Sequence, residues 1–175
     1  MIDKFGQAEL RQAFAALGER LHDRTEIVLG GAGALILTGD LQRATSDCDV
    51  LHSDPDIGQL QEDIRAVAHR LGLPSGWLNG SMQTYLDILP PDYRTRLRSL
   101  SMPGKLQVFV LHRQDVIVMK LFAGRPRDIA DVQSLHPTLN ELTFAKGQLP
   151  RLRAIDATRC ANMESFLQQA SRERP

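Results

Sequence analysis

In the segment EIVL, residues 26–29, the apolar run IVL stops abruptly at Gly30 and Gly31. A run of this length that ends at glycine is typical of a buried strand, because glycine lets the backbone turn tightly. The next segment, residues 32–39, is rich in small and apolar residues and predicts a brief helix that stops at Gly39. The sequence therefore predicts a strand, a glycine turn and a short helix in direct succession.

Two aspartates, Asp47 and Asp49, follow this helix in the segment SDCDVLH, which we predict to be the next strand. Successive side chains of a strand point to opposite faces, so the two carboxylates share one face while Cys48 and Val50 share the other. Strand rise puts the carboxylates about 6–7 Å apart along the backbone. Both can then reach one hard cation or a pair of them, and Mg²⁺ prefers oxygen ligands.

The residues around the aspartates suit a ligand that carries phosphate. The turn at Gly30 and Gly31 can bring bare backbone N–H groups against phosphate oxygens, since no side chain blocks the approach. Arg43 adds a bidentate phosphate donor and Thr45 adds a hydroxyl. Taken singly, these features are common in turns and on surfaces. In this order after a buried strand, they predict metal-assisted phosphoryl or nucleotidyl transfer.

The composition is that of an ordinary globular protein of one domain. The chain has 175 residues, of which 42% are apolar and 24% charged, and its formal net charge is zero. No global basic field therefore argues for nonspecific nucleic-acid binding. Cys48 and Cys160 are too few for a disulfide framework and lack zinc-site spacing. With no amino-terminal apolar segment and no bilayer-length run, we expect a cytoplasmic protein without a membrane partner.

Helical and strand patterns mix along the whole chain. Helical periodicity predicts helices over residues 5–22, 56–72, 91–100, 113–124, 126–135, 138–148 and 158–171. Further short strands are predicted over residues 76–79 and 105–112. The fold class is therefore α/β or α+β, with a small mixed sheet flanked by helices. We predict one domain over 1–136 and a helical carboxy-terminal extension, 137–175, packed on the same domain.

Lys120 lies within the otherwise apolar segment VIVMKLFA. A helix that is apolar all round is buried, and a buried ammonium group is costly unless it is paired. Lys120 should therefore face an anion. One alternative is Asp128 or Asp131, which lie on one helical face three residues apart. The other is a nucleotide phosphate, or the pocket of the Asp-x-Asp pair.

The segment GGAGALILTGDLQRATSDCDV resembles the opening of the DNA polymerase β-type nucleotidyltransferase superfamily, whose pattern is a glycine turn, a helix and Asp-x-Asp. The form Arg-x-Thr-x-Asp-x-Asp is similar to its minimal bacterial branch. That branch includes small stand-alone transferases and the toxins of abortive-infection systems. The segments WLN and DVIVMKLFAGRPRDIADVQSL also resemble it, and the likeness covers roughly residues 26–136.

The resemblance implies a Mg²⁺-dependent transferase that moves a nucleoside monophosphate from an NTP to a hydroxyl or phosphate acceptor. Asp47 and Asp49 would be the catalytic residues and the Mg²⁺ ligands. The residues expected to bind the nucleotide come from the turn, the following loop and the lysine helix: Gly30, Gly31, Arg43, Thr45 and Lys120. The acceptor is left open between an RNA 3′ end and a protein. The branch also implies a toxin–antitoxin context, with an antitoxin-like protein as partner.

The chain departs from the superfamily in its third carboxylate, which active members usually carry on an adjacent strand. The predicted strand at 105–112 offers only Gln107. The remaining candidates are Asn79, an oxygen ligand without charge, and Asp87, if the segment YLDIL is extended. A catalytically inactive nucleotidyltransferase-like binding or regulatory module is therefore the alternative function.

Two other motifs fit less well. The segment GGAGAL suggests the dinucleotide-binding pattern Gly-x-Gly-x-x-Gly, and Gly31 and Gly33 fit its first two positions, but Ile36 occupies the third. The chain also lacks the regular βαβ units of that fold. A calcium loop over DCDVLHSDPD lacks the glycine and the glutamate that such a loop needs.

Overall fold

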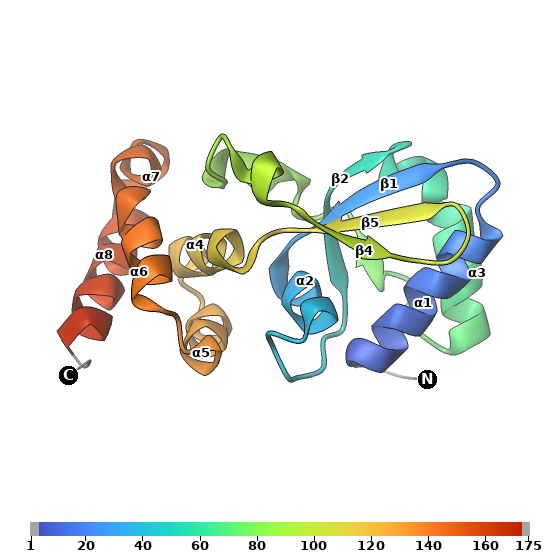
Figure 1. Ribbon diagram of the computed structural model, residues 1–175, viewed down its shortest axis with the longest axis horizontal. Helices are drawn as coiled ribbons and strands as arrows, with labels where there is room; N and C mark the ends of the chain where they lie inside the picture. The colour runs from blue at the N-terminus through green and yellow to red at the C-terminus, as the bar shows by residue number, and fades with distance from the viewer. Residues whose placement is uncertain (1–3, 173–175) are drawn as a thin grey trace.

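The computed structural model describes residues 4–172, which form a mixed sheet with helices around and beyond it (Figure 1). The five strands are β1 (Thr25–Leu29), β2 (Cys48–Asp54), β3 (Leu78–Asn79), β4 (Arg98–Ser101) and β5 (Leu106–Val110). Their spatial order is β3-β2-β1-β5-β4. The central strand β1 runs antiparallel to β2 and parallel to β5. This arrangement confirms the predicted fold class.

Three helices lie on one side of the sheet in Figure 1: α1 (Gln7–Arg20), α2 (Gly31–Thr38) and α3 (Gln61–Leu71). A single 3₁₀ turn, η1 (Ile57–Leu60), leads into α3. Between these helices the rings of Phe14 and Trp77 meet edge to face, with their centroids 5.2 Å apart. The indole N–H of Trp77 donates to the carbonyl oxygen of Ile64 at 3.2 Å. Trp77 therefore anchors the core on this side of the sheet.

From Arg113 to Arg172 the chain is mostly helical. Its helices are α4 (Arg113–Ala123), α5 (Pro126–Leu135), α6 (Leu139–Gly147), α7 (Leu149–Ile155) and α8 (Ala157–Arg172). Helix α4 contacts α2 on one side and α5, α6 and α8 on the other, so it joins the two parts of the molecule (Figure 1). The sequence predicts two helices after residue 137, but the structure has three. Helix α7 is not predicted because its segment contains Pro150, which usually disfavours a helix. The structure places this proline in the first turn, where a helix tolerates it.

The prediction of a helix over residues 91–100 is wrong. A 3₁₀ turn, η3 (Tyr93–Arg96), is followed there by the edge strand β4, which pairs antiparallel with β5. Arg98, Ser99 and Ser101 of β4 are exposed, so the strand lacks the apolar alternation that marks a half-buried strand. Pairing with β5, a tertiary effect, decides its conformation. The segment YLDIL is not extended either, because it lies largely in a third 3₁₀ helix, η2 (Gln83–Ile88).

Helix α2 packs unusually closely on β2. A Cβ atom at Gly33 would lie 2.1 Å from Sγ of Cys48, which is far inside van der Waals contact. The backbone N–H of Gly30 also donates to the carbonyl oxygen of Asp49 at 3.0 Å. The start of α2 is therefore held directly against the part of β2 that carries Asp49.

We expect Gly33→Ala to lower the free energy of unfolding by about 2 kcal/mol, because the overpacking at Cys48 outweighs the better helix propensity of alanine. Urea denaturation measures this change. Adding Cys48→Ala should recover much of the loss. Gly147→Ala is the matched control, because a Cβ there meets no atom within 4 Å. An equal and small effect of both glycine substitutions would contradict the close packing.

Candidate active site

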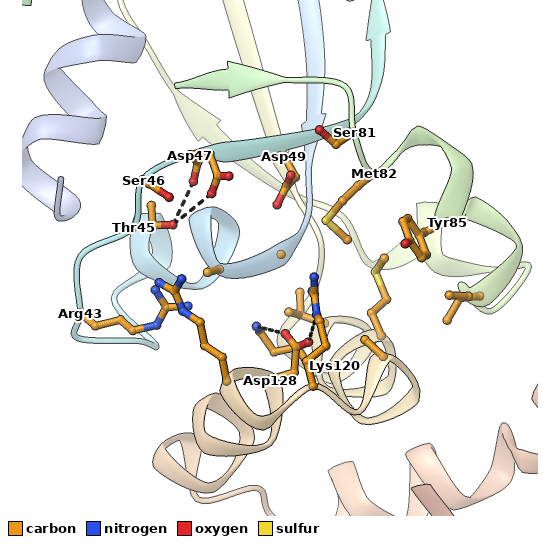
Figure 2. A pocket seen from close by; sticks show the side chains of 18 of the residues that line it. Arg43, Thr45, Ser46, Asp47, Asp49, Ser81, Met82, Tyr85, Lys120 and Asp128 are labelled. Carbon is orange, nitrogen blue, oxygen red and sulfur yellow. Dashed lines mark hydrogen bonds and ion pairs between the residues drawn. The ribbon is translucent and has the colours of Figure 1, made fainter. Parts of the chain in front are cut away.

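A pocket of about 520 Å³ opens between β2 and helices α4 and α5. Its lining includes six of the seven residues that the sequence singles out: Gly31, Arg43, Thr45, Asp47, Asp49 and Lys120. Gly30, the seventh, is buried behind the turn. Figure 2 shows the aspartates on one side of the pocket and Lys120 with Asp128 on the opposite side. The fold therefore gathers in one cavity residues that lie up to 89 positions apart in the sequence, from Gly31 to Lys120.

Asp47 lies just before β2 and is exposed, whereas Asp49 lies within β2 and is partly buried. The hydroxyl of Thr45 donates to the backbone carbonyl of Asp47 at 3.1 Å and approaches its Oδ1 at 3.4 Å (Figure 2). Thr45 itself is buried. Its hydroxyl therefore holds Asp47 in place, and Thr45 also lines the pocket, so its predicted role in nucleotide binding stays a prediction.

Cys48, between the two aspartates, points into the core and is fully buried. Burial, together with the negative charges of Asp49 and Asp47, raises the pKa of the Cys48 thiol. The thiol therefore stays protonated and unreactive at neutral pH. Of residues 47–49, only the two aspartates can therefore carry charge at the pocket.

The carboxyl group of Asp49 resists ionisation. Burial, and next the negative charge of Asp47, raise its pKa from an ordinary 3.8 to about 6, while Arg125 and Lys120 oppose the rise. Neither Asp47 nor Asp49 forms an ion pair with another described residue. Two neighbouring carboxylates repel each other in this way, and a bound cation would stabilise the pair because it offsets the repulsion.

Gly31 sets the distance between the α2 turn and Asp49. Its φ of +59° lies in the left-handed region that glycine tolerates best. A Cβ atom there would lie 2.8 Å from Oδ2 of Asp49 and 3.3 Å from Sδ of Met82. Any other residue would therefore strain the turn and push the carboxylate away from the first turn of α2.

A buried network of charges forms the opposite wall. Lys120 Nζ donates to Asp128 Oδ1 at 3.0 Å and to Asp131 Oδ2 at 2.7 Å, and only 7% of the lysine side chain is exposed. Arg43 binds both oxygens of Asp131 at 2.7 Å through Nε and Nη2. Lys120 thus has the paired aspartates that the sequence offered as one alternative, and it also lines the pocket.

The cations of this network differ in how accessible they are to a ligand. Arg43 also donates to the carbonyl oxygen of Ala44 at 2.9 Å, so three of its donors are already used. Burial opposes ionisation of Asp131, but hydrogen bonds from Arg43 and Lys120 prevail and lower its pKa. Arg125 donates to Asp128 at 2.5 Å, yet 75% of its side chain is exposed. Arg125 is therefore the most accessible cation of this network.

Neither candidate for a third carboxylate joins the aspartates. Asn79 pairs with Asp49 in the sheet, but its Oδ1 accepts from the backbone and hydroxyl of Ser81. Asp87 does not line the pocket, and its backbone carbonyl accepts from Arg151 at 2.5 Å. Within residues 4–172, no three His, Cys, Asp or Glu side chains are grouped so as to hold a metal ion.

The two carboxylates nevertheless match the usual ligands of Mg²⁺. That ion is commonly bound by one or two carboxylates, several waters and the phosphates of a substrate. Asp47 and Asp49 supply the carboxylates, and Gly31 of the adjacent turn lines the same pocket. The residues present therefore fit the metal that the resemblance implies.

A family model described as "Nucleotidyltransferase of unknown function (DUF6036)" matches residues 8–164. The chain belongs to this family. The match confirms that the chain is a nucleotidyltransferase-family protein, as the sequence motifs predict. No curated protein and no solved structure matches the chain. No helix in the described part of this DUF6036 protein is long and apolar enough to cross a bilayer.

Sequence analysis of this DUF6036 protein misses several residues of the pocket. Met82 and Tyr85 come from the segment around η2, Met119 from α4 and Arg159 from α8. The isolated tyrosine, methionines and arginine carry no spacing signal. Only the path of the chain brings them to the pocket. Arg125 and Arg127 also line the pocket, and here the sequence does carry a signal, because the two charges cluster at the Gly-x-Pro break between α4 and α5.

We expect Asp49→Asn to raise the free energy of unfolding at pH 7 in EDTA by about 1 kcal/mol, after allowance for partial exposure. Because the pKa of Asp49 is higher in the folded state, that state holds more protons between pH 3.8 and about 6. The free energy of unfolding of the wild type therefore falls as pH rises through this window, whereas that of the variant does not fall for this reason. Urea denaturation from pH 4 to 8 measures the difference.

The exposed Asp54, on the same strand, supplies the control variant Asp54→Asn. The stabilisation by Asp49→Asn should shrink toward zero at pH 4. A difference between variant and wild type that stays constant from pH 4 to 8 would contradict a raised pKa for Asp49.

Proposed function

We propose that this DUF6036 protein transfers a nucleoside monophosphate from an NTP to a hydroxyl or phosphate acceptor, with Mg²⁺ held by Asp47 and Asp49. One observation carries the proposal. The carboxylates of Asp47 and Asp49, which form no ion pair within residues 4–172, line the same pocket as Lys120 and Arg125, and Asp49 abuts the glycine turn that begins α2. Carboxylates for a metal and donors for phosphate are thus within reach of one ligand.

The polypeptide contributes the following to that reaction. The carboxylates of Asp47 and Asp49 would hold the metal, and Thr45 keeps Asp47 oriented toward it. The backbone N–H groups at the start of α2 can donate to phosphate oxygens, as helix N-termini do. Arg125 can leave Asp128 and bind the triphosphate, because Lys120 remains to neutralise Asp128.

Bound Mg²⁺ would lower the pKa of the attacking hydroxyl and offset the charge of the leaving pyrophosphate. The network of Lys120, Asp131 and Arg43 has a different task. It ties the loop before β2 to α4 and α5, so that the carboxylates and the cations stay on facing walls of the pocket. Preorganised charge of this kind costs little reorganisation during reaction.

The alternative function, a binding or regulatory module without catalysis, also has an observation in its favour. The position opposite Asp49 on β3 is Asn79, whose side chain is held by Ser81 and Gly76. No carboxylate is thus available there to accept a proton from the attacking hydroxyl. This module would bind an NTP with Mg²⁺ but release no pyrophosphate. The RNA or protein acceptor, the toxin–antitoxin context and the cytoplasmic location stay predictions from sequence.

We expect each of the four NTPs to bind in Mg²⁺ and to lose at least about tenfold in affinity in the double variant Asp47→Asn/Asp49→Asn, because both metal ligands are lost. Isothermal calorimetry measures the affinity, with titrations in EDTA as a second arm. Asp54→Asn is the matched control on the same strand. NTP binding that depends neither on Mg²⁺ nor on the two aspartates would disprove the proposal.

A further inference from the structure

The pocket has a second part that the proposed chemistry does not use. Its lining there is apolar and comes from the segment around η2 and from α4: Met82, Tyr85, Ile88, Met119 and Ala123. We call this part the apolar arm. Helix α4 contacts η2 along it. In Figure 2, Met82 and Tyr85 lie on the side of Asp49 away from Arg43 and Thr45.

Tyr85 distinguishes the arm from ordinary core surface. It is 40% exposed, although large apolar side chains are normally covered. The other exposed large apolar residues of the described chain, Leu139 and Ile155, do not line the pocket. An accessible aromatic ring inside a cavity is a stacking surface for a flat group.

The arm is continuous with the charged part of the pocket. Met82 belongs to the arm, and its Sδ lies 3.3 Å from the position of a Cβ on Gly31, the residue that abuts Asp49. One ligand can therefore span both parts. A molecule that fits must have a polyanionic end for the carboxylate-bound metal and the cations, and a flat, weakly polar end for the arm. The pocket volume of about 520 Å³ lies in the range for small-molecule sites.

The wall that carries Tyr85 is fixed from outside. Arg151 of α7 donates through Nη1 to the carbonyl oxygen of Asp87 and through Nη2 to that of Ile88. These two carbonyls belong to the last two residues of η2. The carboxy-terminal helices thus hold the η2 wall in place, so the arm exists before a ligand enters.

We propose that the apolar arm binds the nucleobase of the NTP, with the base stacked on Tyr85. This inference rests on the proposed function, because the triphosphate end defines where the base must lie. Stacking uses the face that every base possesses, whereas discrimination between bases needs contacts to their edges. The arm therefore accepts all four NTPs, and the triphosphate rather than the base determines the substrate class.

The test compares four NTPs with inorganic tripolyphosphate, which has the anionic end but no base. Dissociation constants are measured by calorimetry in Mg²⁺ for the wild type, Tyr85→Ala and Tyr85→Phe. We expect Tyr85→Ala to weaken each NTP by about tenfold and to leave tripolyphosphate within about twofold of wild type. Tyr85→Phe keeps the ring and should behave as wild type. Ile155→Ala, an exposed apolar residue outside the pocket, should change neither probe.

Several outcomes would overturn the inference. An equal loss for NTPs and tripolyphosphate in Tyr85→Ala would mean that the ring supports the phosphate site, and a loss for one base alone would mean edge recognition. If the NTPs keep wild-type affinity in Tyr85→Ala yet lose it in Asp47→Asn/Asp49→Asn, the arm is excluded and the proposed function stands. If neither probe binds in Mg²⁺, both proposals fail.

Discussion

The close approach of helix α2 to strand β2 determines the geometry of the whole site. It depends on Gly33, which leaves room for Cys48, and on Gly31, which turns with a positive φ directly beside Asp49. A side chain at Gly33 would push the helix off the strand, and one at Gly31 would push the carboxylate of Asp49 away from the helix. Because the helix stays close, the backbone at its start and the carboxylates of Asp47 and Asp49 line the same pocket. The chemistry proposed for this DUF6036 protein requires both.

The second determinant is the buried charge network that joins the sheet to the helical part. Lys120 is shared by Asp128 and Asp131, and Arg43 reaches Asp131 from the loop before β2. Each buried charge is paired, which such burial requires. Removal of one partner would leave another uncompensated, so the network holds α4 and α5 at a fixed place opposite the aspartates. The pocket therefore lies between the aspartates and a wall that this network holds together.

The sequence predicts those features whose causes are local. The glycine turn and the alternation of Asp47 with Cys48 follow from a few adjacent residues, and the burial of Lys120 follows from its apolar neighbours. The sequence fails where distant segments decide. Strand β4 exists through its pairing with β5, and Tyr85 reaches the pocket through the path of the η2 segment. Arg43 lines the pocket, but it bonds to Asp131, a partner 88 residues away that no local pattern indicates.

Transfer of label tests the central claim, that Asp47 and Asp49 support nucleotidyl transfer, most directly. The protein is incubated in Mg²⁺ with a mixture of cellular RNA and protein and with each NTP labelled at either the α- or the γ-phosphate. We predict that α-label, but not γ-label, becomes covalently attached to an acceptor, and that Asp47→Asn/Asp49→Asn abolishes the attachment. Attachment of γ-label, or α-labelling that survives in the double variant, would contradict this claim.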